Sequence, residues 1–208
     1  MDLLIPGPAG ELEATLWTPP KTVAARAACV VCHPHPLFGG SMSSSVVFRT
    51  ARGLQLAGLN VLRFNFRGVG KSEGTHDGHG GEADDLGAAL DWLAREFPDL
   101  PLWAGGFSFG SRTAAYRASV DRRIRRVVLV TMPVAKFDCS FLREVEQPGL
   151  IVMAGTDEYG TLAELRRLFP DLHAGLEIQE IGAANHFFEG VTAELQRRVY
   201  DYAQRVLE

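Results

Sequence analysis

Short apolar runs alternate along the chain with stretches in which apolar residues recur at helical spacing. The apolar runs predict strands at residues 11–17, 27–32, 60–66, 102–107, 127–130, 150–154 and 176–181. The amphipathic stretches predict helices at residues 43–57, 82–97, 110–119, 161–169 and 191–207. Strands that alternate with helices in this way indicate an α/β fold, with a mostly parallel central sheet and helices on both of its faces.

Length and composition fit one globular domain. The chain has 208 residues, of which 46% are apolar and 22% charged, as in an ordinary folded protein. No repeat, low-complexity tract or linker interrupts the pattern, so we expect residues 1–208 to form a single domain. Residues 131–149, between two predicted strands, leave room for only one short helix. We therefore expect no sizeable lid domain.

The charge balance is slightly acidic. Lys and Arg number 21 and Asp and Glu number 25, which gives a formal net charge of −4. This balance argues against nucleic acid or an anionic membrane as a partner. A basic run at residues 122–126 is interpreted as a solvated loop before a strand. The N-terminus has neither a basic start nor a long apolar run, so we expect no signal peptide and a cytoplasmic location. The sequence leaves a homodimer open.

The chain has three cysteines, two of which form a C-x-x-C pair, Cys29 and Cys32. They lie within an apolar run that predicts a buried strand, where residues three apart point to opposite faces. A redox pair requires both thiols together at a helix N-terminus. We therefore expect buried core thiols and no disulfide framework.

A G-x-S-x-G motif occupies residues 106–110, between a predicted strand and a predicted helix. A nucleophile elbow requires this context, because a sharp turn there raises the serine hydroxyl out of the sheet at a helix N-terminus. The flanking glycines allow strand and helix to approach closely. Ser108 is therefore the candidate nucleophile, and a glycine-rich turn with a surface serine is the alternative interpretation.

A serine nucleophile requires a base and a carboxylate that orients the base. On this scaffold the acid follows the serine in the chain, and the histidine follows the acid. Asp157 and His186 each come shortly after a predicted strand, in that order. We expect Ser108, His186 and Asp157 to form a triad. Glu158 is the alternative acid, because a shift of one residue in the loop would exchange the two carboxylates.

The loop at residues 33–40 has the sequence HPHPLFGG. An oxyanion hole needs two backbone N–H donors, one from the residue after the nucleophile, Phe109, and one from this loop. The two prolines of the loop have no N–H group. The second donor is therefore His35 or Leu37, and we favour His35.

These motifs together resemble those of small α/β hydrolases, and most closely a compact bacterial branch of that superfamily. The branch is marked by an HPHPxxGG loop, an NFRGxGxSxG loop, the GxSxG elbow and a terminal HFF, which stand here at residues 33–40, 65–74, 106–110 and 186–188. The resemblance covers nearly the whole chain and implies the α/β-hydrolase fold, a triad of Ser108, Asp157 and His186, and esterase-type hydrolysis. The acid loop departs from the usual G-x-x-D pattern by one residue. Counting from Gly155 selects Glu158, whereas matching the ending D-E-aromatic-G selects Asp157.

We expect an open site with apolar walls, which suits an apolar acyl or aromatic group. The expected wall residues are Leu37, Phe38, Phe107, Phe109, Tyr159 and Phe187, although Phe107 could instead face the core. The predicted function is that of a serine hydrolase that cleaves carboxyl esters or thioesters of small substrates through an acyl-enzyme. A small peptide or amide is the second choice of bond. The scheme requires no cofactor and no metal.

Two other classes of function compete with this prediction. A metal-dependent hydrolase could use His33 and His35, or His76 and His79, because imidazoles are common ligands of transition metals. Strand-end histidine pairs of that kind normally belong to barrels of about 250 residues, and the elbow would go unexplained. A hydrolase fold used only for binding is the third class. A binding module needs no nucleophile, base and acid together, so we favour the enzyme.

Overall fold

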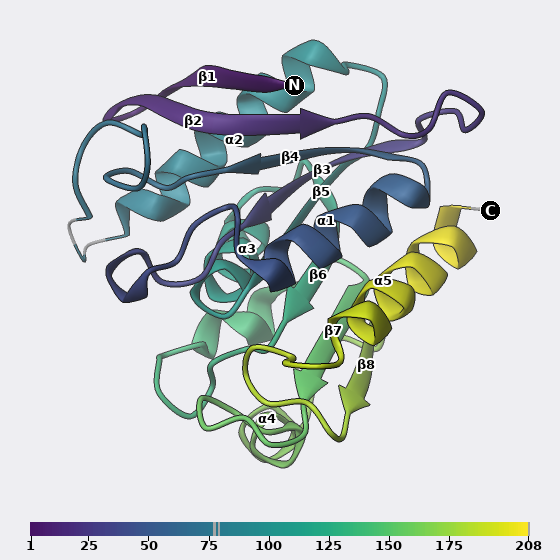
Figure 1. Cartoon of the computed structure of the whole chain (residues 1–208). Helices are drawn as coiled ribbons and strands as arrows, with labels where there is room; N and C mark the ends of the chain where they lie inside the picture. The colour runs from purple at the N-terminus through teal and green to yellow at the C-terminus, as the bar shows by residue number, and fades with distance from the viewer. Residues whose placement is uncertain (77, 79, 208) are drawn as a thin grey trace.

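The computed structural model describes residues 1–76, 78 and 80–207 (Figure 1). Its strands are β1 (Asp2–Gly7), β2 (Gly10–Trp17), β3 (Ala27–Cys32), β4 (Leu59–Phe64), β5 (Leu102–Phe107), β6 (Ile124–Val130), β7 (Gly149–Ala154) and β8 (Leu176–Ile181). Its α-helices are α1 (Ser45–Leu56), α2 (Gly81–Glu96), α3 (Phe109–Val120), α4 (Leu162–Leu168) and α5 (Thr192–Leu207). Two short 3-10 helices are η1 (Pro36–Phe38) and η2 (Ser140–Glu144).

The described strands form one sheet in the order β1-β2-β4-β3-β5-β6-β7-β8. The strand β2 pairs antiparallel with β1 and β4, and the other neighbours pair in parallel. The predicted α/β fold with a mostly parallel sheet is therefore confirmed. The carboxyl ends of β3 to β8 lie along one edge, where sites form in open parallel sheets.

Helices cover both faces of the sheet. In Figure 1, α1 and α5 lie in front of the strands and α2 and α3 lie behind them. Side chains of β3 alternate between the two sides, because successive residues of a strand point to opposite faces. Cys29 packs in the cluster with α1 and α5, whereas Cys32 packs in the cluster with α2 and α3. The two thiols are thus separated by the sheet as predicted, and burial raises the pKa of each.

The structure differs from the predicted strands in two places. The first strand, β1, was not predicted, because Pro6 and Gly7 are poor strand formers. As the first strand of the sheet order β1 pairs on one side with β2, and an edge strand tolerates proline. The basic run at residues 122–126 is not all loop, since β6 begins at Ile124. Arg126 belongs to the strand, where it pairs with Trp103 of β5, and its guanidinium lies 5.8 Å from the Trp103 ring.

The segment between β6 and β7 contains only the short helix η2. This confirms the expectation that no sizeable lid domain is inserted there.

The longest described helices, α2 and α5, have 16 residues each. The helix α5 carries two ion pairs between residues four apart, Arg197 with Asp201 and Arg198 with Glu194. Across the described residues, no helix combines the length and the apolar character needed to cross a membrane.

Candidate active site

Ser108 occupies the tight turn between β5 and α3. Its backbone has a φ of 54°, a conformation that costs a non-glycine residue about 1–3 kcal/mol. The turn is this tight because glycines flank it: a Cβ on Gly106 would lie 2.3 Å from the Gly110 carbonyl carbon. A Cβ on Gly110 would in turn lie 2.5 Å from the carbonyl oxygen of Cys32. The Ser108 N–H donates to the Val130 carbonyl (2.9 Å), which fixes the turn against the neighbouring strand.

His186 lies between Ser108 and Asp157. Its Nε2 is 3.0 Å from Ser108 Oγ, and its Nδ1 is 2.9 and 2.8 Å from the two carboxylate oxygens of Asp157. Because a carboxylate only accepts, Nδ1 carries the proton, and the lone pair of Nε2 faces the serine hydroxyl. The structure thus brings together the three residues predicted from the sequence.

The neighbouring carboxylates Asp157 and Glu158 have opposite environments. The Asp157 side chain is fully buried and also accepts the Tyr159 N–H (2.8 Å). Glu158 is exposed and makes no hydrogen bond or ion pair with the described residues. The geometry therefore places Asp157, and not Glu158, against His186.

The loop that carries His186 is fixed by residues that sequence reasoning missed. Phe188 is fully buried with a φ of 53°, so its ring anchors the loop in the core. The Asn185 side-chain oxygen accepts the N–H groups two and four residues later. Thr156, in the acid loop, donates through its N–H and its hydroxyl to the Ala184 carbonyl. The HFF motif was visible in the sequence, but the anchoring role of its second phenylalanine was not.

The predicted oxyanion donors can now be compared. The Leu37 N–H donates to the ring nitrogen Nδ1 of His35 (3.2 Å) and is therefore occupied. The N–H groups of His35 and Phe109 have no hydrogen-bond partner among the described residues. The rings of these two residues pack 4.8 Å apart, so the loop and the start of α3 lie side by side. Of the two alternatives in the loop, the geometry favours His35.

The histidines of the metal hypothesis have other roles in the structure. His33 is fully buried, with Nδ1 2.6 Å from the Pro34 carbonyl and Nε2 accepting the Phe66 N–H (3.0 Å), so both ring nitrogens are used. His76 hydrogen-bonds through Nδ1 to Glu82. His79 lies outside the described residues. Within the described part of the chain, no three His, Cys, Asp or Glu side chains are grouped to hold a metal.

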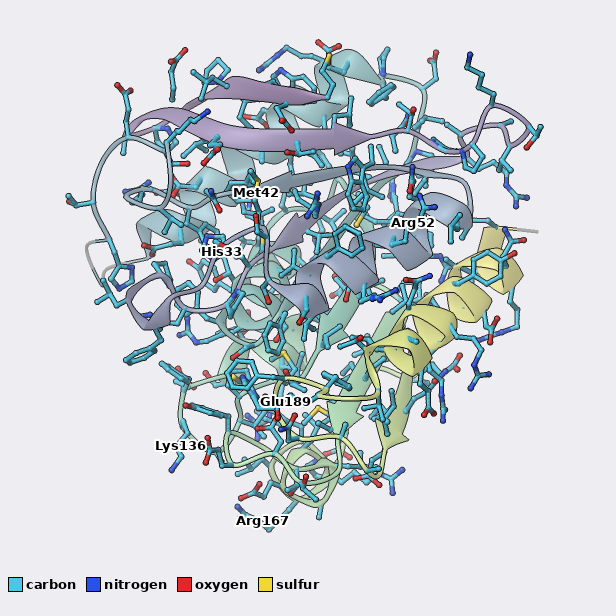
Figure 2. All side chains as sticks on the ribbon, in the orientation of Figure 1. His33, Met42, Arg52, Lys136, Arg167 and Glu189 are labelled. Carbon is cyan, nitrogen blue, oxygen red and sulfur yellow. The ribbon has the colours of Figure 1, made fainter. Side chains whose placement is uncertain are left out.

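His33 (labelled in Figure 2) joins the loops that follow β3 and β4, and this role makes stability depend on pH. Burial lowers its pKa from 6.5 to about 4, so the folded state binds no proton at pH 4–6.5, whereas the unfolded chain does. The free energy of unfolding therefore falls as the pH drops through this window and is fully retained above it. At about 1.4 kcal/mol per pH unit, the loss is about 3 kcal/mol.

We expect His33→Gln to remove this contribution. Urea unfolding at pH 7, 5.5 and 4 should show the stability difference between wild type and variant shrinking by about 3 kcal/mol towards pH 4. An identical pH dependence in both proteins would contradict this reading of His33.

The loop after β4 is attached to α2 by a buried ion pair. The Arg67 guanidinium donates to both carboxylate oxygens of Asp85, and its Nη2 also donates to the Gly81 carbonyl (2.7 Å). The Arg67 N–H donates to the same carboxylate (3.0 Å). Breaking such a pair leaves a buried charge and typically costs about 3–5 kcal/mol. The pair thus fixes the start of α2 relative to the loops around the site.

A cavity of about 230 Å³ opens beside Ser108. Its lining includes Phe38, Tyr159 and Phe187, as expected from the sequence. Leu37 was expected in this wall but does not line the cavity, and its side chain on η1 is 69% exposed. Phe107 is fully buried and faces the core, with its ring 5.0 Å from that of His186. Phe107 therefore packs against the His186 ring from the core side and does not line the cavity.

The sheet order, the serine elbow and the histidine–carboxylate pair define the class of protein. The profile of the alpha/beta hydrolase fold matches residues 30–150. The chain therefore belongs to the α/β-hydrolase family, as the resemblance of its motifs implied.

Three relatives place the chain within this family. It is 35% identical to the Rickettsia prowazekii protein named "Uncharacterized protein RP471", with 94% of this chain and 85% of that protein covered. A solved structure described as an alpha-beta serine hydrolase homologue from Coxiella burnetii shares 35% identity at a TM-score of 0.90, covering 97% and 96% of the two chains. The structure of XC6422 from Xanthomonas campestris, described as an a/b serine hydrolase without lid, shares 31% identity at a TM-score of 0.91, covering 99% and 94%. The chain is thus similar over nearly its whole length to two bacterial proteins described as a serine hydrolase homologue and as a serine hydrolase without lid.

Proposed function

We propose that the protein hydrolyses carboxyl esters or thioesters by acyl transfer through Ser108. The observation that carries this proposal is the unbroken chain of contacts from Ser108 Oγ to His186 Nε2 and from His186 Nδ1 to Asp157. A protein that only bound its ligand would have no use for a serine in a strained turn aimed at a histidine whose tautomer is fixed.

The residues of the site divide the steps of the proposed reaction among them. His186 Nε2 takes the proton of Ser108 as Oγ attacks the carbonyl carbon, and Asp157 stabilises the imidazolium that forms. The N–H groups of Phe109 and His35 donate to the oxyanion. His186 then gives its proton to the leaving oxygen or sulfur, and the acyl group stays on Ser108. A water molecule, deprotonated by His186, releases the acid and restores the serine.

The cavity beside Ser108 favours a short apolar acyl group. Its volume of about 230 Å³ is below the range of about 300–1,000 Å³ for sites that hold a whole small molecule. The rings of Phe38, Tyr159 and Phe187 in its lining suit an apolar chain or a small ring. Esters and thioesters are both compatible with the triad, and the leaving atom distinguishes them.

A fluorophosphonate probe tests whether Ser108 is activated. We expect the wild type to be labelled and Ser108→Ala not to be, because such probes react with a serine that an adjacent base deprotonates. Butyryl esters and thioesters, assayed with and without EDTA, then define the bond. A folded wild type that escapes labelling would contradict the triad, and EDTA-sensitive hydrolysis without labelling would favour a metal mechanism.

A further inference from the structure

A second and larger cavity adjoins the one beside Ser108. Its volume is about 620 Å³, against about 230 Å³ for the first. His35, Phe109 and Phe137 line both cavities, so the two meet along a shared wall. The larger volume falls within the range of about 300–1,000 Å³ that is typical of small-molecule sites. The bulkier part of a substrate therefore fits the second cavity, and only a short group fits the first.

The shared wall coincides with the proposed oxyanion hole, because His35 and Phe109 carry its two donors. A carbonyl carbon whose oxygen is held there has two remaining substituents. One can extend into each cavity. The first cavity, below the range for a whole ligand, takes the acyl chain. The second then takes the leaving group.

Aromatic rings form one part of the lining of the second cavity. Phe109 and Phe137 lie at the shared wall, and Tyr116 and Phe141 lie farther along. The rings of Tyr116 and Phe141 meet edge to face, with centroids 5.4 Å apart. Flat apolar faces of this kind suit a ligand that has a C–H-rich face.

Polar groups of both signs form the other part of the lining. The Arg112 guanidinium lies 5.3 Å from the Phe141 ring, and its Nε donates to the Asp138 carbonyl (2.8 Å). Its two Nη atoms have no hydrogen-bond partner among the described residues and are available to a ligand. Asp84 and Asp138 line the same cavity and are exposed, and one carboxylate oxygen of Asp138 also accepts the Ser140 N–H (2.9 Å). Glu82 is buried and already hydrogen-bonded to His76.

This combination selects for the charge of the ligand. An anionic group would meet the carboxylates of Asp84 and Asp138, and a cationic group would meet Arg112. An uncharged polyol satisfies both, because each hydroxyl donates to a carboxylate and accepts from a guanidinium. We propose that the second cavity binds a sugar-like polyol, esterified to a short apolar acyl group, as the leaving alcohol.

The step rests on the proposed function and balances without a further reactant. Ser108 Oγ forms a bond to the acyl carbon, and the bond from that carbon to the sugar oxygen breaks. The proton that His186 took from Ser108 passes to the sugar oxygen, which leaves as a hydroxyl. Water then splits the acyl-enzyme into the acid and free Ser108.

Two esters with the same acyl group test this inference. We expect kcat/KM for methyl 6-O-butyryl-glucoside to exceed that for ethyl butyrate by at least tenfold. Arg112→Met should lower this ratio about tenfold, because a hydrogen bond to a charged group typically contributes about that factor. Arg167→Met, on the exposed outer side of α4 (labelled in Figure 2), is the matched control and should keep the ratio.

A second variant and a binding measurement separate the outcomes. Asp84→Asn should also lower the ratio of kcat/KM for the glucoside ester to that for ethyl butyrate. This variant replaces Arg112→Met in the test if thermal unfolding shows that Arg112→Met is not folded. Ser108→Ala should bind the glucoside ester more tightly than ethyl butyrate, as measured by ligand-observed NMR. Two outcomes would overturn this inference and leave the proposed function standing. One is Ser108-dependent hydrolysis of ethyl butyrate with no preference for the glucoside ester. The other is a preference for the glucoside ester that is unchanged in both Arg112→Met and Asp84→Asn. Absence of Ser108-dependent turnover of either ester would overturn the proposed function as well.

Discussion

Replacing Ser108 by alanine is expected to abolish turnover of butyryl esters and to leave the fold intact. Oγ is the atom that would form the acyl-enzyme. Alanine has no such atom, so any remaining hydrolysis would require direct attack by water. Losing the nucleophile of a serine triad typically costs a factor of 10⁴ or more, about 5.5 kcal/mol in the barrier. Alanine keeps the same backbone strain at φ 54°, so the melting temperature should stay close to that of the wild type.

The matched control is Ser119→Ala, at the far end of the same helix. Its hydroxyl donates to the Tyr116 carbonyl (2.8 Å) and lies away from both cavities. Progress curves at saturating ester should show wild-type rates for this variant. Residual turnover by Ser108→Ala within tenfold of the wild type would mean that another group carries the reaction.

The second large effect is expected for Asp157→Asn. An amide in place of the carboxylate presents an N–H donor to Nδ1 of His186, which favours the tautomer with the proton on Nε2, facing the serine. A base in that tautomer cannot accept the Ser108 proton, and the corresponding substitution in a serine protease lowers kcat about 10⁴-fold. Labelling by fluorophosphonate should slow in parallel, because it requires the same deprotonation.

Glu158→Gln is the matched change one residue later. Glu158 is exposed and unpartnered within the described chain, so this variant should keep the wild-type kcat. A loss of activity in Glu158→Gln with full activity in Asp157→Asn would show that Glu158, and not Asp157, is the acid partner of His186. Wild-type activity in both variants would show that the histidine needs no acid partner.

The three residues of the proposed triad could be selected from the sequence because their placement follows simple rules. Each stands just after an apolar run, and parallel strands bring their carboxyl ends to one edge of the sheet. The pattern favoured Asp157 but left Glu158 open as the alternative acid. The choice depends on the turn in which Asp157 accepts the Tyr159 N–H, and no periodicity reports such a turn.

Other features required the folded chain. The second cavity is formed by residues from four separate segments, including His76, Arg112 and Phe141, whose proximity no local pattern indicates. The inward or outward direction of Leu37 depends on one turn of 3-10 helix in η1. The strand β1 was not predicted because it contains Pro6. Proline argues against a central strand, but an edge strand such as β1 tolerates it, and only the sheet order shows that β1 lies at the edge.

The last strand of the sheet, β8, leads directly into the loop that carries His186, whereas β5, which leads to Ser108, lies near the middle. Edges of a structure open locally at lower free energy than its centre. The proposed base and nucleophile thus belong to regions of unequal protection against hydrogen exchange. On heating, fraying of β8 would separate the pair while the remaining sheet is still folded. Activity would then be lost at a lower temperature than the melting temperature of the protein, and the temperature of inactivation would report the opening of β8 alone.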